Sequence, residues 1–306
     1  LALEDAIHAA GGCAALVRGA EEWSAHPHAA AVAGQALLEI ERFGDAPPIP
    51  LPKGERPLAG IRVLDLTRVL AGPTAAKTLA EHGADVLKIT AAHLPDSGDI
   101  DLDTGIGKLS AQLDLREAAG MATLRTLVQG ADVFSQSYRP GALDARGFSA
   151  QELAKLRPGL VHVSLSAWGP TGPWKDRRGF DSIVQCVSGM AVAQGGAGGP
   201  KLMPCSAIDY VSGYLMAYGA MVALARRAKE GGSWRVRVAL ARVGKWIVDR
   251  GLVDPSGAVE TTAQTMETVS PAGVITHLKP VVQMSETPAF WARPPVPLGY
   301  HRAEWP

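Results

Sequence analysis

The fold is decided by residues 61–89, which read IRVLDLTRVLAGPTAAKTLAEHGADVLKI. The run at 61–66 is rich in aliphatic and β-branched residues and predicts a strand. Residues 74–82 place alanine and leucine side chains on one helical face, and Gly83 is a natural stop, so they predict a helix. Residues 85–89 predict a second strand. A strand–helix–strand unit of this length implies a right-handed crossover between parallel strands.

The same alternation continues along the chain. Further helices and strands are expected at residues 116–129, 133–134, 149 onward, 160–165, 209–228 and 234–240. The helix from Ser149 opens with a capping box that Glu152 completes. This pattern predicts an α/β fold with a largely parallel sheet and flanking helices.

Proline marks the first boundary. Residues 46–52 read APPIPLP, and four prolines so close together cannot continue a helix or a central strand. We therefore divide the chain into an N-terminal segment with its linker (1–50), a large domain (51–250) and an extended C-terminal segment richer in proline and threonine (251–306).

Composition excludes several classes of protein. Lysine plus arginine equals aspartate plus glutamate, 30 each, so no charge excess favours nucleic acid. The three cysteines stand far apart in no metal-ligand spacing, which favours free thiols in a reducing cytoplasm and no metal site. The longest uncharged stretch, 210–225, has 16 residues, fewer than the roughly 20 of a membrane span. A helix buried against the sheet is the better interpretation.

A candidate ligand site lies at the turn 67–73, between the first strand and its helix. In open parallel sheets, ligands bind beyond the carboxyl ends of strands, near helix N-termini. The turn offers backbone N–H groups and Arg68 for a phosphate. No glycine-rich dinucleotide or P-loop motif is present. On these grounds alone, a purely structural turn is as good an interpretation as a phosphate site.

Six ordered motifs carry a family resemblance. They are PLAGIRVLDLTRVLAGP with GADVLKI (57–73 and 83–89), GKLSAQLDL (107–115), YRPG (138–141), GPTGPW (169–174), GFDSIVQCVSG (179–189) and LGYH (298–301). Together they resemble the class III coenzyme A (CoA) transferases, the CaiB/BaiF family. That family includes formyl-CoA and carnitine CoA-transferases and α-methylacyl-CoA racemases.

The resemblance implies a Rossmann-like large domain, a small domain and an interlocked homodimer, with acyl-CoA and a carboxylate as substrates. By position it places Arg68, Val69, Leu70 and Ala71 against the adenine end of CoA. It also assigns the phosphates to Lys108 and Arg139 and the channel wall to Tyr138. Taken without the resemblance, Lys108 and Arg139 are surface charges and Tyr138 is a core residue.

Two departures concern the chemistry. The family's transferases use an aspartate in a glycine loop, and the corresponding loop, 195–200, carries Gly198 at that place. The racemases use a histidine and an aspartate as two bases, and those positions hold Phe180 and Asp209. The resemblance thus leaves Asp209 as the expected base or nucleophile, with Asp181 beside it.

Both aspartates have a structural alternative, since each lies near a helix start and could act as a cap. Three functions remain open. The favoured one is transfer of CoA between carboxylic acids. The alternatives are an acyl-CoA racemase or isomerase that uses Asp209, and a catalytically silent CoA-binding subunit.

The order of segments is a further departure. Residues 12–27 resemble the end of the family's small domain, which in ordinary members follows the large domain. We expect residues 1–50 to be a remnant of that domain, from a parent chain with a permuted or duplicated arrangement whose first part is missing here.

Overall fold

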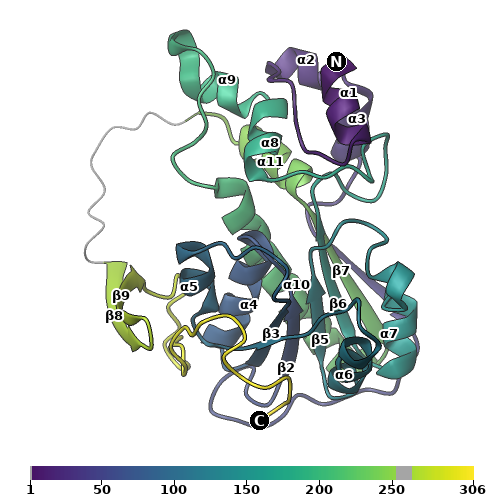
Figure 1. Cartoon of the computed structure of the whole chain (residues 1–306), viewed down its shortest axis with the longest axis vertical. Coiled ribbons are helices and arrows are strands. Elements are labelled where there is room, and N and C mark those ends of the chain that lie inside the picture. Colours follow the sequence, from purple (N-terminus) through teal and green to yellow (C-terminus); the bar gives the residue numbers. More distant parts are fainter. Residues whose placement is uncertain (1, 253–263) are drawn as a thin grey trace.

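A seven-stranded sheet forms the centre of the computed structural model, which describes residues 2–252 and 264–306 (Figure 1). The strand order is β1-β7-β6-β5-β2-β3-β4, and all neighbours are parallel except β1 and β7. The strands are β1 (Glu39–Gly44), β2 (Arg62–Leu66), β3 (Asp85–Thr90), β4 (Lys108–Gln112), β5 (Val133–Gln136), β6 (Val161–Ser166) and β7 (Ser233–Ala239). The predicted largely parallel α/β sheet is confirmed.

Helices cover both faces of this sheet. Those next to the sheet are α4 (Ala71–Glu81), α6 (Ala118–Gln129), α7 (Ala150–Leu156) and α10 (Ala207–Glu230), with α5 (Asp99–Gly105) beside α4 and a 3-10 turn η1 (Asp144–Arg146) before α7. Side chains alternate along β2, so that Val63 belongs to the apolar cluster under α4 and α10, and Leu64 to the cluster under α6. Burial on both faces explains the nearly continuous apolar runs that the sequence shows.

The long helix α10 lies across α4 at close range. A Cβ atom added to Gly213 would come within 2.6 Å of the Ala71 carbonyl oxygen, so only glycine permits this approach. By length and composition α10 is long and apolar enough to cross a membrane, but 56% of its most apolar window is buried within the protein. This burial is typical of a core helix, in agreement with the expected packing.

A second group of helices stands beyond the carboxyl end of the sheet (Figure 1). It comprises α1 (Ala2–Ala9), α2 (Ala20–Ser24), α3 (Pro27–Ala33), α8 (Asp181–Val187), α9 (Met190–Gly195) with the 3-10 turn η2 (Gly196–Gly198), and α11 (Leu240–Val248). The Trp23 ring lies tilted against the rings of Trp168 and Trp174, at centroid distances of 6.4 and 5.8 Å. These rings join the N-terminal helices to the segment that follows β6.

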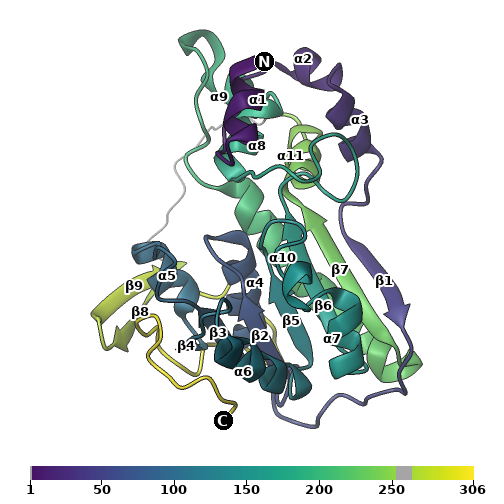
Figure 2. The same cartoon turned by 45° about the vertical axis from the view of Figure 1, so that its right-hand side comes forward.

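The first 50 residues do not form a separate unit. Glu39–Gly44 adds to the main sheet as edge strand β1, antiparallel to β7 (Figure 2). The proline-rich segment therefore connects two strands of one sheet and does not separate two domains. The strand β1, with the sequence EIERFG, was not predicted, because its charged residues interrupt any long apolar run.

In the described residues 264–306 the chain forms a hairpin of β8 (Thr265–Ser270) and β9 (Gly273–Leu278), and residues 279–306 contain no helix or further strand. Its last part runs along the edge strand β4. The Gly107 N–H donates to the Arg293 carbonyl (2.9 Å), and the His301 N–H donates to the Ser110 carbonyl (2.7 Å). The Trp305 indole N–H then donates to the Leu127 carbonyl at 3.0 Å, which fixes the chain end to α6.

Candidate active site

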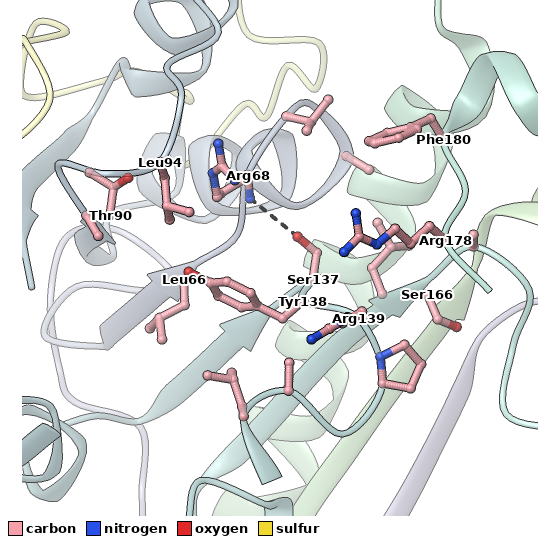
Figure 3. Close-up of a pocket in the computed structure, with 18 of the residues that line it drawn as sticks. Leu66, Arg68, Thr90, Leu94, Ser137, Tyr138, Arg139, Ser166, Arg178 and Phe180 are labelled. Atoms are coloured by element: carbon pink, nitrogen blue, oxygen red, sulfur yellow. Dashed lines mark hydrogen bonds between the residues drawn. The ribbon is translucent and has the colours of Figure 1, made fainter. Parts of the chain in front are cut away.

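A cavity of about 580 Å³ opens at the carboxyl ends of β2, β3, β5 and β6 (Figure 3). One part of its wall is apolar, with Leu66, Ile89 and Leu113. The rim is cationic and includes Arg68, Arg116, Arg139, Arg146, Arg177 and Arg178. An apolar wall beneath several guanidinium groups suits a ligand with an apolar body and negatively charged phosphates.

The β2–α4 turn forms one side of this cavity. Val69 has a left-handed backbone (φ 68°), which is unusual for a β-branched residue and marks local strain. The Arg68 N–H donates to the Ser137 hydroxyl at 3.3 Å, and its guanidinium donates to the Pro95 carbonyl at 2.6 Å. Leu70 and Ala71 complete the turn, and all four residues assigned to the adenine end line the cavity. Their contact with adenine stays a prediction.

Lys108 differs from expectation. Its side chain is only 1% exposed, and its ammonium group donates to Asp65 Oδ2 (2.9 Å) and to the Pro73 carbonyl (2.8 Å). It does not line the cavity. The expectation that Lys108 faces a phosphate is therefore corrected: Lys108 is a structural residue that ties β4 to β2 and to the first turn of α4.

Tyr138 and Arg139 follow β5 and both line the cavity, and their contacts with CoA stay predictions. Burial raises the pKa of the Tyr138 phenol, so the hydroxyl stays neutral at physiological pH. The adjacent pair Arg177 and Arg178 also lines the cavity and was not predicted. The only signal for them was two consecutive arginines directly before the Gly179–Phe180 motif.

Asp209 lies in the first turn of α10 and is the one carboxylate among the described residues that line the cavity. It is 7% exposed. Burial raises the pKa of Asp209 to about 7, and the neighbouring Asp181 carboxylate adds to the shift. A helix N-terminus favours the charged form, but here desolvation dominates. At neutral pH the group is divided between acid and carboxylate, which is the range useful for acid–base or nucleophilic chemistry.

Asp181 contacts the backbone of Asp209 and does not itself line the cavity. Its Oδ2 accepts the Asp209 backbone N–H at 3.0 Å, so it caps the start of α10. Its Oδ1 accepts the Gln185 side-chain amide, and Gln185 Oε1 in turn accepts the Met203 N–H at 2.8 Å. The structure thus brings the two predicted aspartates together, and Asp181 caps α10 rather than α8, the helix that it begins.

The two positions that departed from the family pattern lie apart. Phe180 lines the cavity and is 48% exposed. Gly198 lies in the η2 turn outside the cavity, and a Cβ atom there would meet no atom within 4 Å. A carboxylate at position 198 would stand in solvent, so the cavity offers Asp209 as its acidic group.

Comparison with known proteins identifies the family of the chain. The sequence pattern of CoA-transferase family III matches residues 58–277, which is more than half of the chain. The chain belongs to this family. Acetyl-coenzyme A transferase nodX of Hypoxylon pulicicidum is 35% identical over 201 residues, which cover 63% of this chain and 34% of that protein. Human succinyl-CoA:glutarate CoA-transferase is 32% identical over 183 residues, which cover 55% and 41%.

A solved structure is also similar. The hypothetical protein Rv3272 of Mycobacterium tuberculosis is 30% identical, with a TM-score of 0.60 over 67% of this chain and 58% of that chain. This family III chain thus spans about a third to two fifths of the length of the curated relatives named above.

Proposed function

We propose that the protein binds an acyl-CoA in the 580 Å³ cavity and transfers CoA between carboxylic acids. One observation carries the proposal: a cationic rim and a buried carboxylate with a raised pKa face the same cavity. The names of the relatives, which act on acetyl-CoA or succinyl-CoA, support the reaction class. The acyl group is set by pocket shape, which the family motifs do not record.

Asp209 is the nucleophile in this proposal. Its carboxylate attacks the thioester carbonyl carbon, the C–S bond breaks, and the CoA thiolate departs while a mixed anhydride forms on Asp209. The thiolate then attacks the Asp209 carbonyl carbon, which releases the first acid as a carboxylate and leaves CoA as a thioester on Asp209. The acceptor carboxylate attacks this thioester to form a second anhydride, and the thiolate attacks its acyl carbon to give the new acyl-CoA and free Asp209. Asp181 holds the backbone of Asp209 in place, and its negative charge adds to the burial that raises the Asp209 pKa. The cationic rim, with Arg68 and Arg139, receives the phosphates of CoA.

The alternatives fit less well. Racemisation by two bases requires a second proton acceptor on the other side of the α-carbon. At the position that carries a histidine in the racemases this chain has Phe180, which lines the cavity. Solvent deuterium exchange at the α-carbon of an acyl-CoA separates racemisation from transfer.

We further propose the reducing cytoplasm as location and an interlocked homodimer as assembly, both from the family resemblance. Size-exclusion chromatography with light scattering tests the dimer.

Arg68→Ala is expected to weaken CoA binding about 10- to 100-fold, because a hydrogen bond to a charged group contributes roughly 1.5–3 kcal/mol. The measurement is isothermal titration of the full-length protein with CoA. Arg226→Ala is the matched control, since Arg226 is an exposed arginine outside the cavity. No CoA binding by the unsubstituted protein would remove the proposed function altogether.

The rate of transfer is expected to rise with pH and to level off above about pH 7. Only the deprotonated Asp209 can attack the thioester, and its pKa is raised to about 7. Below that value the rate should fall about tenfold for each pH unit. Single-turnover rates between pH 5 and 9 check the profile. A flat profile from pH 5 upward would show that the nucleophile is another group or that its pKa is ordinary.

A further inference from the structure

The face of the sheet that α6 covers is divided into two unlike halves. Under α6 the strands present apolar side chains such as Leu64, Leu87 and Phe134. On β6, β7 and β1 the same face is polar. His162 pairs in register with Arg235, Ser164 with Arg237, and Arg237 in turn with Glu39. Polar side chains on a central strand of a largely parallel sheet are unusual, since such strands are normally buried by apolar contacts.

A second cavity, of about 960 Å³, lies over this polar half. Its walls come from α3, the segment after β5, the start of α7 and the loop 169–176. It adjoins the first cavity, because Tyr138, Pro140, Leu165 and Ser166 line both. Arg235, Arg237 and His162 line only the second cavity.

The two arginines of this cavity are in different states. Arg237 is saturated by carboxylates: its Nε donates to Glu39 Oε2 (2.9 Å) and a terminal nitrogen donates to Glu41 Oε2 (3.2 Å). Arg235 makes no hydrogen bond to the described part of the chain, and its Nε is buried without a partner. The nearest carboxylate oxygen, on Glu41, is 3.9 Å away.

Arg235 is nevertheless held in place, because its guanidinium lies 4.9 Å from the centre of the Phe43 ring. An arginine stays charged at neutral pH. A fixed, partly buried guanidinium with unfilled donors is costly unless an anion or water satisfies it.

Two neighbours on β6 also have unfilled hydrogen-bonding capacity. His162 is 6% exposed and its Nδ1 has no partner. Burial lowers the pKa of His162 to about 4, so the ring is neutral at pH 7 and adds no charge. The Ser164 hydroxyl makes only a long contact, 3.5 Å, to the Val236 carbonyl. Arg235, His162 and Ser164 thus form a small polar group at the floor of the cavity.

We propose that this second cavity binds a small monocarboxylate anion through the guanidinium fork of Arg235, with His162 and Ser164 beside it. The planar fork matches the two oxygens of a carboxylate. The other charges of the wall favour a single negative charge on the ligand. Besides Arg235, the wall carries two cationic side chains and three carboxylates: Lys175 and Arg237, and Glu39, Asp144 and Asp176. The carboxylates would therefore repel a multiply charged anion. This site lies outside the CoA cavity and goes beyond the proposed transfer reaction.

Saturation-transfer NMR of the full-length protein with acetate at pH 7 tests the proposal, and inorganic phosphate is the second probe. Acetate is expected to bind more tightly than phosphate. Arg235→Gln should weaken acetate binding at least tenfold. Arg226→Gln, which removes an exposed arginine from α10, should leave it unchanged.

A second variant guards against misfolding of Arg235→Gln. Gly34 lines the cavity with an ordinary backbone (φ −78°), and an added Cβ would meet nothing closer than 3.7 Å. Gly34→Asp should therefore fold normally and weaken acetate binding several-fold by repulsion. Unchanged acetate binding in both variants, binding of phosphate in place of acetate, or binding of neither anion would overturn the proposal.

Discussion

Asp209→Asn is expected to reduce CoA transfer by at least about 10³-fold while CoA binding persists. Removing a nucleophile leaves only binding and positioning, and losses of this size or larger are typical of such changes. The structure gives a specific reason to choose this residue, since it is the cavity carboxylate in the described chain. Steady-state transfer from an acyl-CoA to a carboxylate, with isothermal titration of CoA in parallel, measures both effects.

The same substitution should not destabilise the fold. The folded-state pKa of Asp209 is raised to about 7 from an ordinary value of 3.8. Its contribution to stability is therefore full below pH 4 and is lost as the pH rises through 7. At pH 8 the Asn variant should unfold at an equal or higher temperature. Asp45→Asn is the control, because the Asp45 side chain is 99% exposed.

Turnover by the Asp209→Asn variant above a tenth of the unsubstituted rate would point to a catalytically silent role for Asp209.

Lys108→Met is expected to lower the free energy of unfolding by about 3–5 kcal/mol, the usual cost of breaking one side of a buried ion pair. It leaves the Asp65 carboxylate, which is 0% exposed, with its Thr67 hydrogen bonds but without a cation. Urea denaturation at pH 7 measures the loss. The double variant Asp65→Asn/Lys108→Met should recover part of it, because no uncompensated charge remains.

Lys155→Met is the matched control for this experiment. Lys155 pairs with Glu152 on the surface with 72% of its side chain exposed. Exposed pairs of this kind contribute about 0–1 kcal/mol. If Lys108→Met behaved like this control and instead lost CoA affinity, the original assignment of Lys108 to a phosphate would be restored.

The helices and strands that depend on short-range sequence patterns were predicted from the sequence. The unit β2–α4–β3 was predicted because burial on both faces of the sheet leaves continuous apolar runs, and because Gly83 ends the helix. The cavity-lining turn at residues 68–71 was predicted because ligands of parallel sheets collect beyond the strand ends. These arguments need only short-range information.

The predictions that were wrong or missing concern residues whose interaction partners lie far away in the sequence. Lys108 reads as a surface or ligand-binding charge until its carboxylate partner, 43 residues earlier in the chain, is placed beside it. The edge strand β1 was missed for the same reason, since Glu39 and Glu41 make sense in a strand only opposite Arg235 and Arg237. Which aspartate faces the cavity also required the fold, because Asp181 and Asp209 have similar positions at helix starts.

The C-terminal segment that runs along β4 affects how the protein behaves at high concentration. An open outer strand offers unpaired N–H and C=O groups on which another chain can polymerise. Here the backbone of Gly107 and Ser110 already bonds to Arg293 and His301. At the opposite border, β1 carries the charged side chains of Glu39, Glu41 and Arg42. Both edges of the sheet are thus protected against strand-to-strand pairing with another chain, β4 by the segment that covers it and β1 by charge.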